Sequence, residues 1–219
     1  VEQGAAGVAL LAGATGLGGR EVLAARLADE TYAAVHSVGR RAPPISRPRL
    51  TCHAVHLGAL PALPRADAVY IALGTTIKVA GSQAAFRAVD YEAVVAAAQA
   101  ARASGATRLG VISAMGANSR SSVFYNRVKG DMEQAVCRQG FDSVVIVRPS
   151  IIAGDRSSLQ QPGRNAEGWA LRAMRLLNPL MPANYKTIRP DQIARTLTRA
   201  VKAGQPGVQR IPSGRMQAL

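Results

Sequence analysis

The strongest constraint on the fold is an apolar run that leads directly into a glycine-rich turn. Residues 7–13, GVALLAG, are continuously apolar over the length of a strand that is buried on both faces. The next segment, LGGREVLAARLADE at residues 17–30, has the spacing of an amphipathic helix. A strand without a polar face needs helices on both sides, so this unit predicts a parallel sheet in an α/β fold.

The same alternation of strand and helix continues along the first two thirds of the chain. We expect further strands at residues 33–40, 49–57, 66–74, 107–113 and 142–150, and helices at residues 83–104 and 121–139. Residues 40–49, RRAPPISRPR, read as a loop between two strands. Right-handed crossovers between parallel strands then give a doubly wound parallel sheet with helices on both faces.

The chain is less regular after residue 150. A loop is expected at residues 154–165, followed by helices at 166–177 and 190–203. Ligands of such folds bind at the carboxyl ends of the strands, so residues 150–190 are expected to form a small C-terminal substrate-pocket segment and lid. Its candidate walls are large side chains: Trp169, Met174, Leu177, Met181 and Tyr185. Without an internal repeat or a linker, we assign residues 1–219 to one domain.

Composition narrows the class of protein. Hydrophobic residues make up 48% of the chain but aromatic residues only 4%, so the core must be built from Ala, Val, Leu and Ile. No apolar run reaches the ~20 residues of a membrane-spanning helix, and the opening residues read as a first strand rather than a signal peptide. Cys52 and Cys137 are expected to be buried thiols in a reducing compartment, which predicts a cytoplasmic protein. The three histidines are interpreted as structural, and no metal site is expected.

The net charge of +14 raises the question of nucleic-acid binding. The positive residues are nearly all arginines, and they are scattered rather than gathered into a basic block with interleaved aromatic residues. We therefore expect incidental basicity with weak attraction to polyanions and no specific nucleic-acid partner. Nucleic-acid binding through the positive surface stays as an alternative.

The turn GATGLGGR carries glycines at spacings of three. Gly13 permits a tight turn, Gly16 allows the backbone to approach a pyrophosphate, and Gly19 lets the helix pack against the strand. The amino end of the helix supplies unpaired N–H groups for an anion. A dinucleotide phosphate site is therefore predicted over the whole turn: Gly13, Thr15, Gly16, Leu17, Gly18 and Gly19.

The residue that closes the second strand selects the dinucleotide. A carboxylate there would bind the 2′-hydroxyl of NAD(H), but this chain has Arg40 and Arg41. Guanidinium groups pair with a 2′-phosphate, which favours NADP(H) over NAD(H). The alternative is that both arginines simply belong to an arginine-rich loop.

Three side chains have the types and spacing of a carbonyl-reduction site. Tyr125 and Lys129 lie one helical turn apart in FYNRVKG, and Ser113 ends the fifth strand twelve residues before Tyr125. Hydride transfer leaves an alkoxide that needs a proton, and a neighbouring ammonium would lower the pKa of the phenol that supplies it. The serine would hold the carbonyl oxygen. Each residue also has a structural interpretation, as a strand-end cap, a packing residue and a solvated lysine.

These segments together resemble the short-chain dehydrogenase/reductase superfamily, and more narrowly its atypical branch typified by the Tat-interacting-protein oxidoreductase. The similarity lies in LAGATG, ALGTT, SAMGANSRSSVFYNRVKG and VRPSIIAGDR, between residues 8 and 156. It implies an NAD(P)-binding Rossmann domain with Ser113, Tyr125 and Lys129 in the catalytic positions. It further implies that the cofactor contacts Leu73, Gly74, Thr75, Pro149, Ser150, Ile151 and Ile152. Relatives often place an acidic residue near the adenine, where this chain has HLGAL, so the adenine contacts are expected to come from the backbone or from Leu57.

The sequence leads to two principal hypotheses for function. The first is an NADP(H)-dependent oxidoreductase that acts on a carbonyl or alcohol of unknown identity, as a monomer or homodimer. The second is a non-catalytic NADP(H)-binding regulator or sensor that acts through a protein partner. Loss of turnover without loss of cofactor affinity in Tyr125→Phe would distinguish them.

Overall fold

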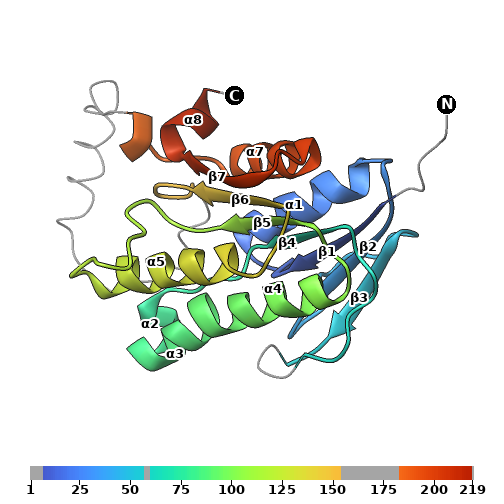
Figure 1. The fold of residues 1–219 in the computed structure, drawn as a ribbon, viewed down its shortest axis with the longest axis horizontal. Helices are drawn as coiled ribbons and strands as arrows, with labels where there is room; N and C mark the ends of the chain where they lie inside the picture. The colour runs from blue at the N-terminus through green and yellow to red at the C-terminus, as the bar shows by residue number, and fades with distance from the viewer. Residues whose placement is uncertain (1–6, 57–59, 154–182, 219) are drawn as a thin grey trace.

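The computed structural model describes residues 7–56, 60–153 and 183–218, which form a seven-stranded parallel sheet (Figure 1). The strand order is β3-β2-β1-β4-β5-β6-β7, and every neighbouring pair is parallel. The strands are β1 (Gly7–Ala12), β2 (Tyr32–Gly39), β3 (Leu50–Ala54), β4 (Ala68–Ile71), β5 (Arg108–Ile112), β6 (Ser143–Arg148) and β7 (Gly207–Pro212). The predicted α/β doubly wound fold is confirmed.

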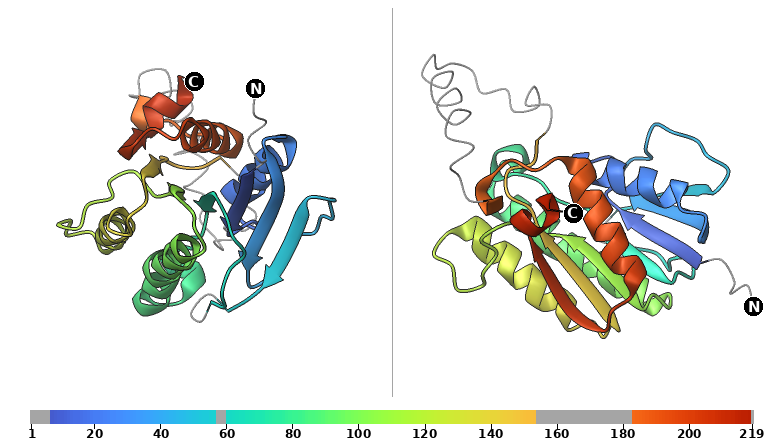
Figure 2. Two further views of the ribbon diagram at one scale, coloured as in Figure 1. Left: turned by 45° about the vertical axis from the view of Figure 1, so that its right-hand side comes forward. Right: turned by 90° about the horizontal axis from the view of Figure 1, so that it is seen from above.

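Helices cover both faces of this sheet (Figures 1 and 2). The helices are α1 (Leu17–Ala28), α2 (Ile77–Ala80), α3 (Gln83–Arg87), α4 (Val94–Ala103), α5 (Phe124–Cys137), α7 (Pro190–Ala203) and α8 (Ser213–Gln217). On one face, α1 and α7 pack against the sheet through Leu23 and Leu197. On the other face, α4 and α5 pack through Ala98 and Met132. Small and branched aliphatic side chains fill both cores, as expected from the composition.

Three features differ from the expected elements. The helix expected at 83–104 is interrupted by a π-helical turn, Ala88–Ala93, so that α3 and α4 are separate. Strand β7 was not foreseen because it is an edge strand whose side chains are mostly exposed, which leaves no apolar pattern. Cys52 is exposed rather than buried because it lies on the other edge strand, β3, while Cys137 is partly buried.

The two helices expected after residue 150 have different outcomes. The helix expected at 190–203 coincides with α7. The helix expected at 166–177 and the candidate walls Trp169, Met174, Leu177 and Met181 lie outside the described residues. Within the described ranges, no helix has both the length and the apolar character needed to cross a bilayer.

The topology fixes where a ligand can bind. The chain runs from β1 outward to β3 and then returns to β4 on the opposite side of β1. Crossovers therefore leave β1 in opposite directions, and the carboxyl ends of β1 and β4 border a crevice where such folds bind ligands.

Candidate functional site

The glycine turn connects β1 to α1 at this crevice. Gly13 has φ of 93°, and a Cβ on it would lie 2.7 Å from the backbone of Ala72 after β4. A Cβ on Gly19 would lie 2.0 Å from the carbonyl oxygen of Gly13. Both positions therefore require glycine, because any side chain would push the helix away from the turn. Gly16 caps α1 without a side chain, so the N–H groups of the first turn are open to an anionic ligand.

The residues expected to select the dinucleotide lie directly after β2. Arg40 and Arg41 are both exposed there. Leu57, the expected adenine contact, is outside the described residues. The positions of the two arginines are compatible with a 2′-phosphate, and the preference for NADP(H) stays a prediction.

Two further segments expected at the cofactor follow β4 and β6. Leu73, Gly74 and Thr75 come directly after β4, and the N–H of Thr75 donates to the carboxylate of Asp90 at 2.9 Å. After β6, the carbonyl of Pro149 accepts the N–H of Met115 at 2.8 Å.

The rest of the segment after β6 contacts the C-terminal part of the chain. The hydroxyl of Ser150 lies 2.9 Å from that of Ser213 in α8. Ile151 is half exposed, and Ile152 forms an isolated parallel bridge with Ile188.

Lys129 of α5 forms a buried ion pair. Its Nζ lies 2.7 Å from Oδ1 of Asp90, and both side chains are almost completely buried. A Cβ on Gly74 would lie 3.9 Å from this Nζ and 3.4 Å from Asp90 Oδ1. The ammonium of Lys129 therefore ends beside the loop after β4, and its contact with a cofactor stays a prediction.

Tyr125 lies one turn before Lys129 and is largely buried against Phe86, with ring centroids 5.3 Å apart. Burial, and secondly the negative charge of Asp90, raise the pKa of Tyr125 to about 12. The expectation that the pKa of Tyr125 is lowered is therefore wrong. The physical reason is that burial of the phenol, and secondly the charge of Asp90, disfavour its ionised form.

The hydroxyl of Ser113 is bound to a different carboxylate. It donates to Oε1 of Glu133 at 2.6 Å, and Ser113 is 5% exposed. Glu133 also accepts two hydrogen bonds from Arg148, at 2.9 and 2.6 Å, and one from Arg210 at 3.4 Å. The structure thus brings Tyr125 and Lys129 together on one helix but places the Ser113 hydroxyl in a separate polar cluster.

Sequence reasoning missed both carboxylates. Asp90 lies in the alanine-rich segment QAAFRAVDYEAVVAAAQAA together with Glu92, and the sequence does not show which of the two acids is buried. Glu133 follows Lys129 by four residues, which indicates a shared helix face but gives no partner. Only the tertiary structure shows that the two acids have different partners.

The histidines do not join the candidate site. Nδ1 of His36 in β2 lies 2.9 Å from Nε2 of His53 in β3. Burial and the neighbouring His53 lower the pKa of His36. Across the part of the chain that the structure describes, no three potential metal-binding side chains gather into one group.

Several solved structures have the same fold as this chain. A short-chain dehydrogenase family protein from Francisella tularensis superposes with a TM-score of 0.70 over 97% of this chain and 100% of that chain, at 14% identity. MoeE5 in complex with UDP-glucuronic acid and NAD gives 0.70 over 95% of this chain and 76% of that one, at 17% identity. UDP-glucose 4-epimerase from Thermotoga maritima gives 0.65 over 95% and 77%, at 16% identity. The chain shares the Rossmann fold of these proteins.

Proteins related in sequence identify the family of this chain. No family model matches the chain. "Protein FMP52-1, mitochondrial" of Scheffersomyces stipitis is 31% identical over 156 residues, which cover 68% of this chain and 69% of that protein. "Protein fmp52, mitochondrial" of Aspergillus fumigatus is 36% identical over 180 residues, covering 76% and 73%. These names overturn the expectation of a cytoplasmic protein, which rested only on two unpaired cysteines. The chain belongs to the FMP52 family.

Proposed function

We propose that this protein is an NADP(H)-dependent oxidoreductase of the short-chain dehydrogenase/reductase type that acts on a carbonyl or alcohol. The observation that carries the proposal is the position of Lys129, whose ammonium is held by Asp90 beside the loop after β4, one turn from Tyr125. Ion pairs between buried groups are costly unless their geometry is fixed, so this arrangement is expected at a functional crevice. The similarity to the Tat-interacting-protein branch supports the same assignment.

In the proposed reaction the nicotinamide supplies the hydride when NADP(H) is bound. Tyr125 donates its proton to the oxygen of the reduced substrate, which suits a phenol that is protonated throughout the physiological pH range. Lys129 would position the cofactor ribose. Leu73, Gly74 and Thr75 line the cofactor on one side, and Pro149, Ser150, Ile151 and Ile152 pass near the carboxamide. We further infer that the protein works in mitochondria, as the names of its relatives say of them.

The alternative, a regulator that binds NADP(H) without turnover, is favoured by two observations. The pKa of Tyr125 is raised rather than lowered, and the hydroxyl of Ser113 is bound to Glu133. A site that only binds the dinucleotide needs neither an acidic phenol nor a free serine.

Two measurements on matched variants test the proposal. Tyr125→Phe should bind NADPH with unchanged affinity in calorimetry, while its rate of NADPH oxidation over a panel of aldehydes, ketones and quinones falls by ~10²-fold or more. Arg40→Glu should weaken NADPH binding but not NADH binding. If wild type oxidises NADPH with none of these compounds yet binds it tightly, the regulator is favoured. Equal affinity of wild type for both dinucleotides would contradict the NADP(H) assignment.

A further inference from the structure

A pocket lies between α1 and the connection from β2 to β3, next to the glycine turn, whose Ala14 lines it. Parallel neighbouring strands are usually joined through a helix that packs on the sheet, but residues 40–49 connect β2 to β3 without one. The space beside α1 is therefore only partly filled, which leaves a cavity of about 630 Å³. This volume is in the range of pockets that hold small organic ligands.

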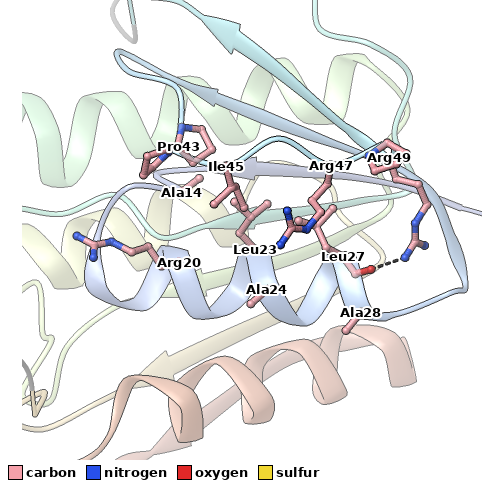
Figure 3. A pocket seen from close by; sticks show the side chains of 12 residues that line it. Ala14, Arg20, Leu23, Ala24, Leu27, Ala28, Pro43, Ile45, Arg47 and Arg49 are labelled. Carbon is pink, nitrogen blue, oxygen red and sulfur yellow. Dashed lines mark hydrogen bonds between the residues drawn. The ribbon is translucent and has the colours of Figure 1, made fainter.

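The walls of this pocket are apolar (Figure 3). One side is the face of α1 that carries Leu23 and Leu27, and the other is the connection with Pro43 and Ile45. Pro43, Pro44 and Pro48 of the connection have no N–H group, so this wall offers few donors to a base, a sugar or a peptide. A hydrocarbon chain needs no such donors, and its burial here would remove apolar surface from water.

The charged residues of the pocket are all positive. Arg20, Arg47 and Arg49 line it, and none of its lining residues is acidic. The guanidinium of Arg49 donates three hydrogen bonds, to the carbonyls of Leu27, Asp29 and Tyr32, which fix the connection against the end of α1. These hydrogen bonds hold the connection in place, so that the pocket stays open.

The other two arginines retain binding capacity. Arg20 donates from Nε to the carbonyl of Thr15 at 3.1 Å, and Arg47 donates from one terminal nitrogen to the carbonyl of Ser46 at 2.9 Å. Each guanidinium carries five N–H groups, so most of them remain for an anion. A carboxylate is the small planar anion that matches this geometry.

We propose that this pocket binds a fatty acid, with its single aliphatic chain along α1 and its carboxylate at Arg20 or Arg47. The apolar walls favour a hydrocarbon chain, and the positively charged rim favours a carboxylate at the end of that chain. Arg20 is also bound to Thr15 in the glycine turn, so the pocket is adjacent to the dinucleotide site without sharing Arg40 or Arg41. The proposal does not depend on the oxidoreductase assignment.

The test uses the full chain and the fluorescent fatty acid cis-parinaric acid, displaced by laurate or by uncharged dodecanol. Wild type should bind the probe, and carboxylates from eight to twelve carbons should displace it about fourfold better with each added CH₂. Ala24→Trp fills the pocket from an exposed position on α1 and should weaken probe binding by ~tenfold or more. Ala84→Trp, at an exposed alanine of α3, is the matched control and should bind like wild type.

The anionic part of the proposal is tested with Arg47→Gln. This variant should lose affinity for laurate by ~tenfold but keep its affinity for dodecanol. Equal binding of laurate and dodecanol by wild type would overturn the fatty-acid assignment, as would unchanged probe binding by Ala24→Trp. Displacement of the probe by stoichiometric NADPH would show that the pocket belongs to the dinucleotide site, which also overturns the proposal.

Discussion

Asp90 and Glu133 both carry almost fully buried carboxylates, but their partners differ. Asp90 pairs with one equally buried ammonium, that of Lys129, and accepts the N–H of Thr75 from the loop after β4. Glu133 binds the hydroxyl of Ser113 and two guanidinium groups, Arg148 and Arg210, that are 30% and 43% exposed.

The difference concerns how far each charge acts. The charges around Glu133 reach solvent, which screens them, so this cluster mainly joins α5 to β5, β6 and β7. The pair of Asp90 and Lys129 is shielded from solvent. Burial raises the pKa of Tyr125, and the charge of Asp90 adds to this effect. Two acids with the same burial can therefore differ in electrostatic effect: solvent screens the cluster of Glu133, whereas the charge of Asp90 acts on Tyr125.

The largest effect is expected from Glu133→Ala. It leaves the Ser113 hydroxyl and the Arg148 guanidinium without their acceptor, which should lower the free energy of unfolding by about 3–5 kcal/mol. Urea denaturation measures this. NADPH affinity of the folded variant should be unchanged, and a loss of affinity would show that this cluster is not merely structural.

Asp90→Asn should have a smaller effect on stability and a specific effect on Tyr125. The amide can still accept the N–H of Thr75, so the expected loss is about 2–3 kcal/mol for the unpaired ammonium. Removal of the negative charge should lower the pKa of Tyr125 from about 12. Absorbance titration of the phenol, with Tyr125→Phe as the blank, measures the shift. An unchanged pKa would mean that Asp90 does not act on the tyrosine.

Tyr125 should also make stability depend on alkaline pH. Its pKa is about 12 in the folded chain and about 10 when unfolded, so between these values the unfolded state releases a proton that the folded state keeps. Stability from this group is complete below pH 10 and is lost as pH rises to 12, by about 2 kcal/mol. Tyr125→Phe should remove that part of the decline in urea denaturation, whereas Glu133→Gln should not. Superimposable pH profiles of wild type and Tyr125→Phe would contradict the raised pKa.

Ser113→Ala is expected to have the smallest effect. It removes one hydrogen bond to a carboxylate that keeps its two arginine partners, at a cost of about 1.5 kcal/mol in thermal or urea unfolding. If Ser113 acts only through Glu133, the rate of NADPH oxidation changes little. A fall in rate of ~10²-fold with unchanged stability would show that Ser113 acts on the substrate.

Much of the fold and part of the site follow from the sequence alone. Continuous apolar runs have the length of buried strands, and the glycine spacing of GATGLGG requires a tight turn before a helix, so the parallel sheet and the turn could be predicted. The four-residue spacing of Tyr125 and Lys129 likewise predicted their shared helix. Strand β7 could not be predicted, because an exposed edge strand has no periodic apolar pattern.

What only the tertiary structure decided is which charges meet. Asp90 and Lys129 are 39 residues apart, and Ser113 and Glu133 are 20 apart, so no local pattern pairs them. The pocket beside α1 likewise depends on how a connection without a helix lies over the sheet. Helix and strand patterns arise from short-range periodicity, whereas a pKa and a cavity depend on long-range contacts. The sequence therefore determined the scaffold and the candidate residues, and the fold determined their electrostatic environment.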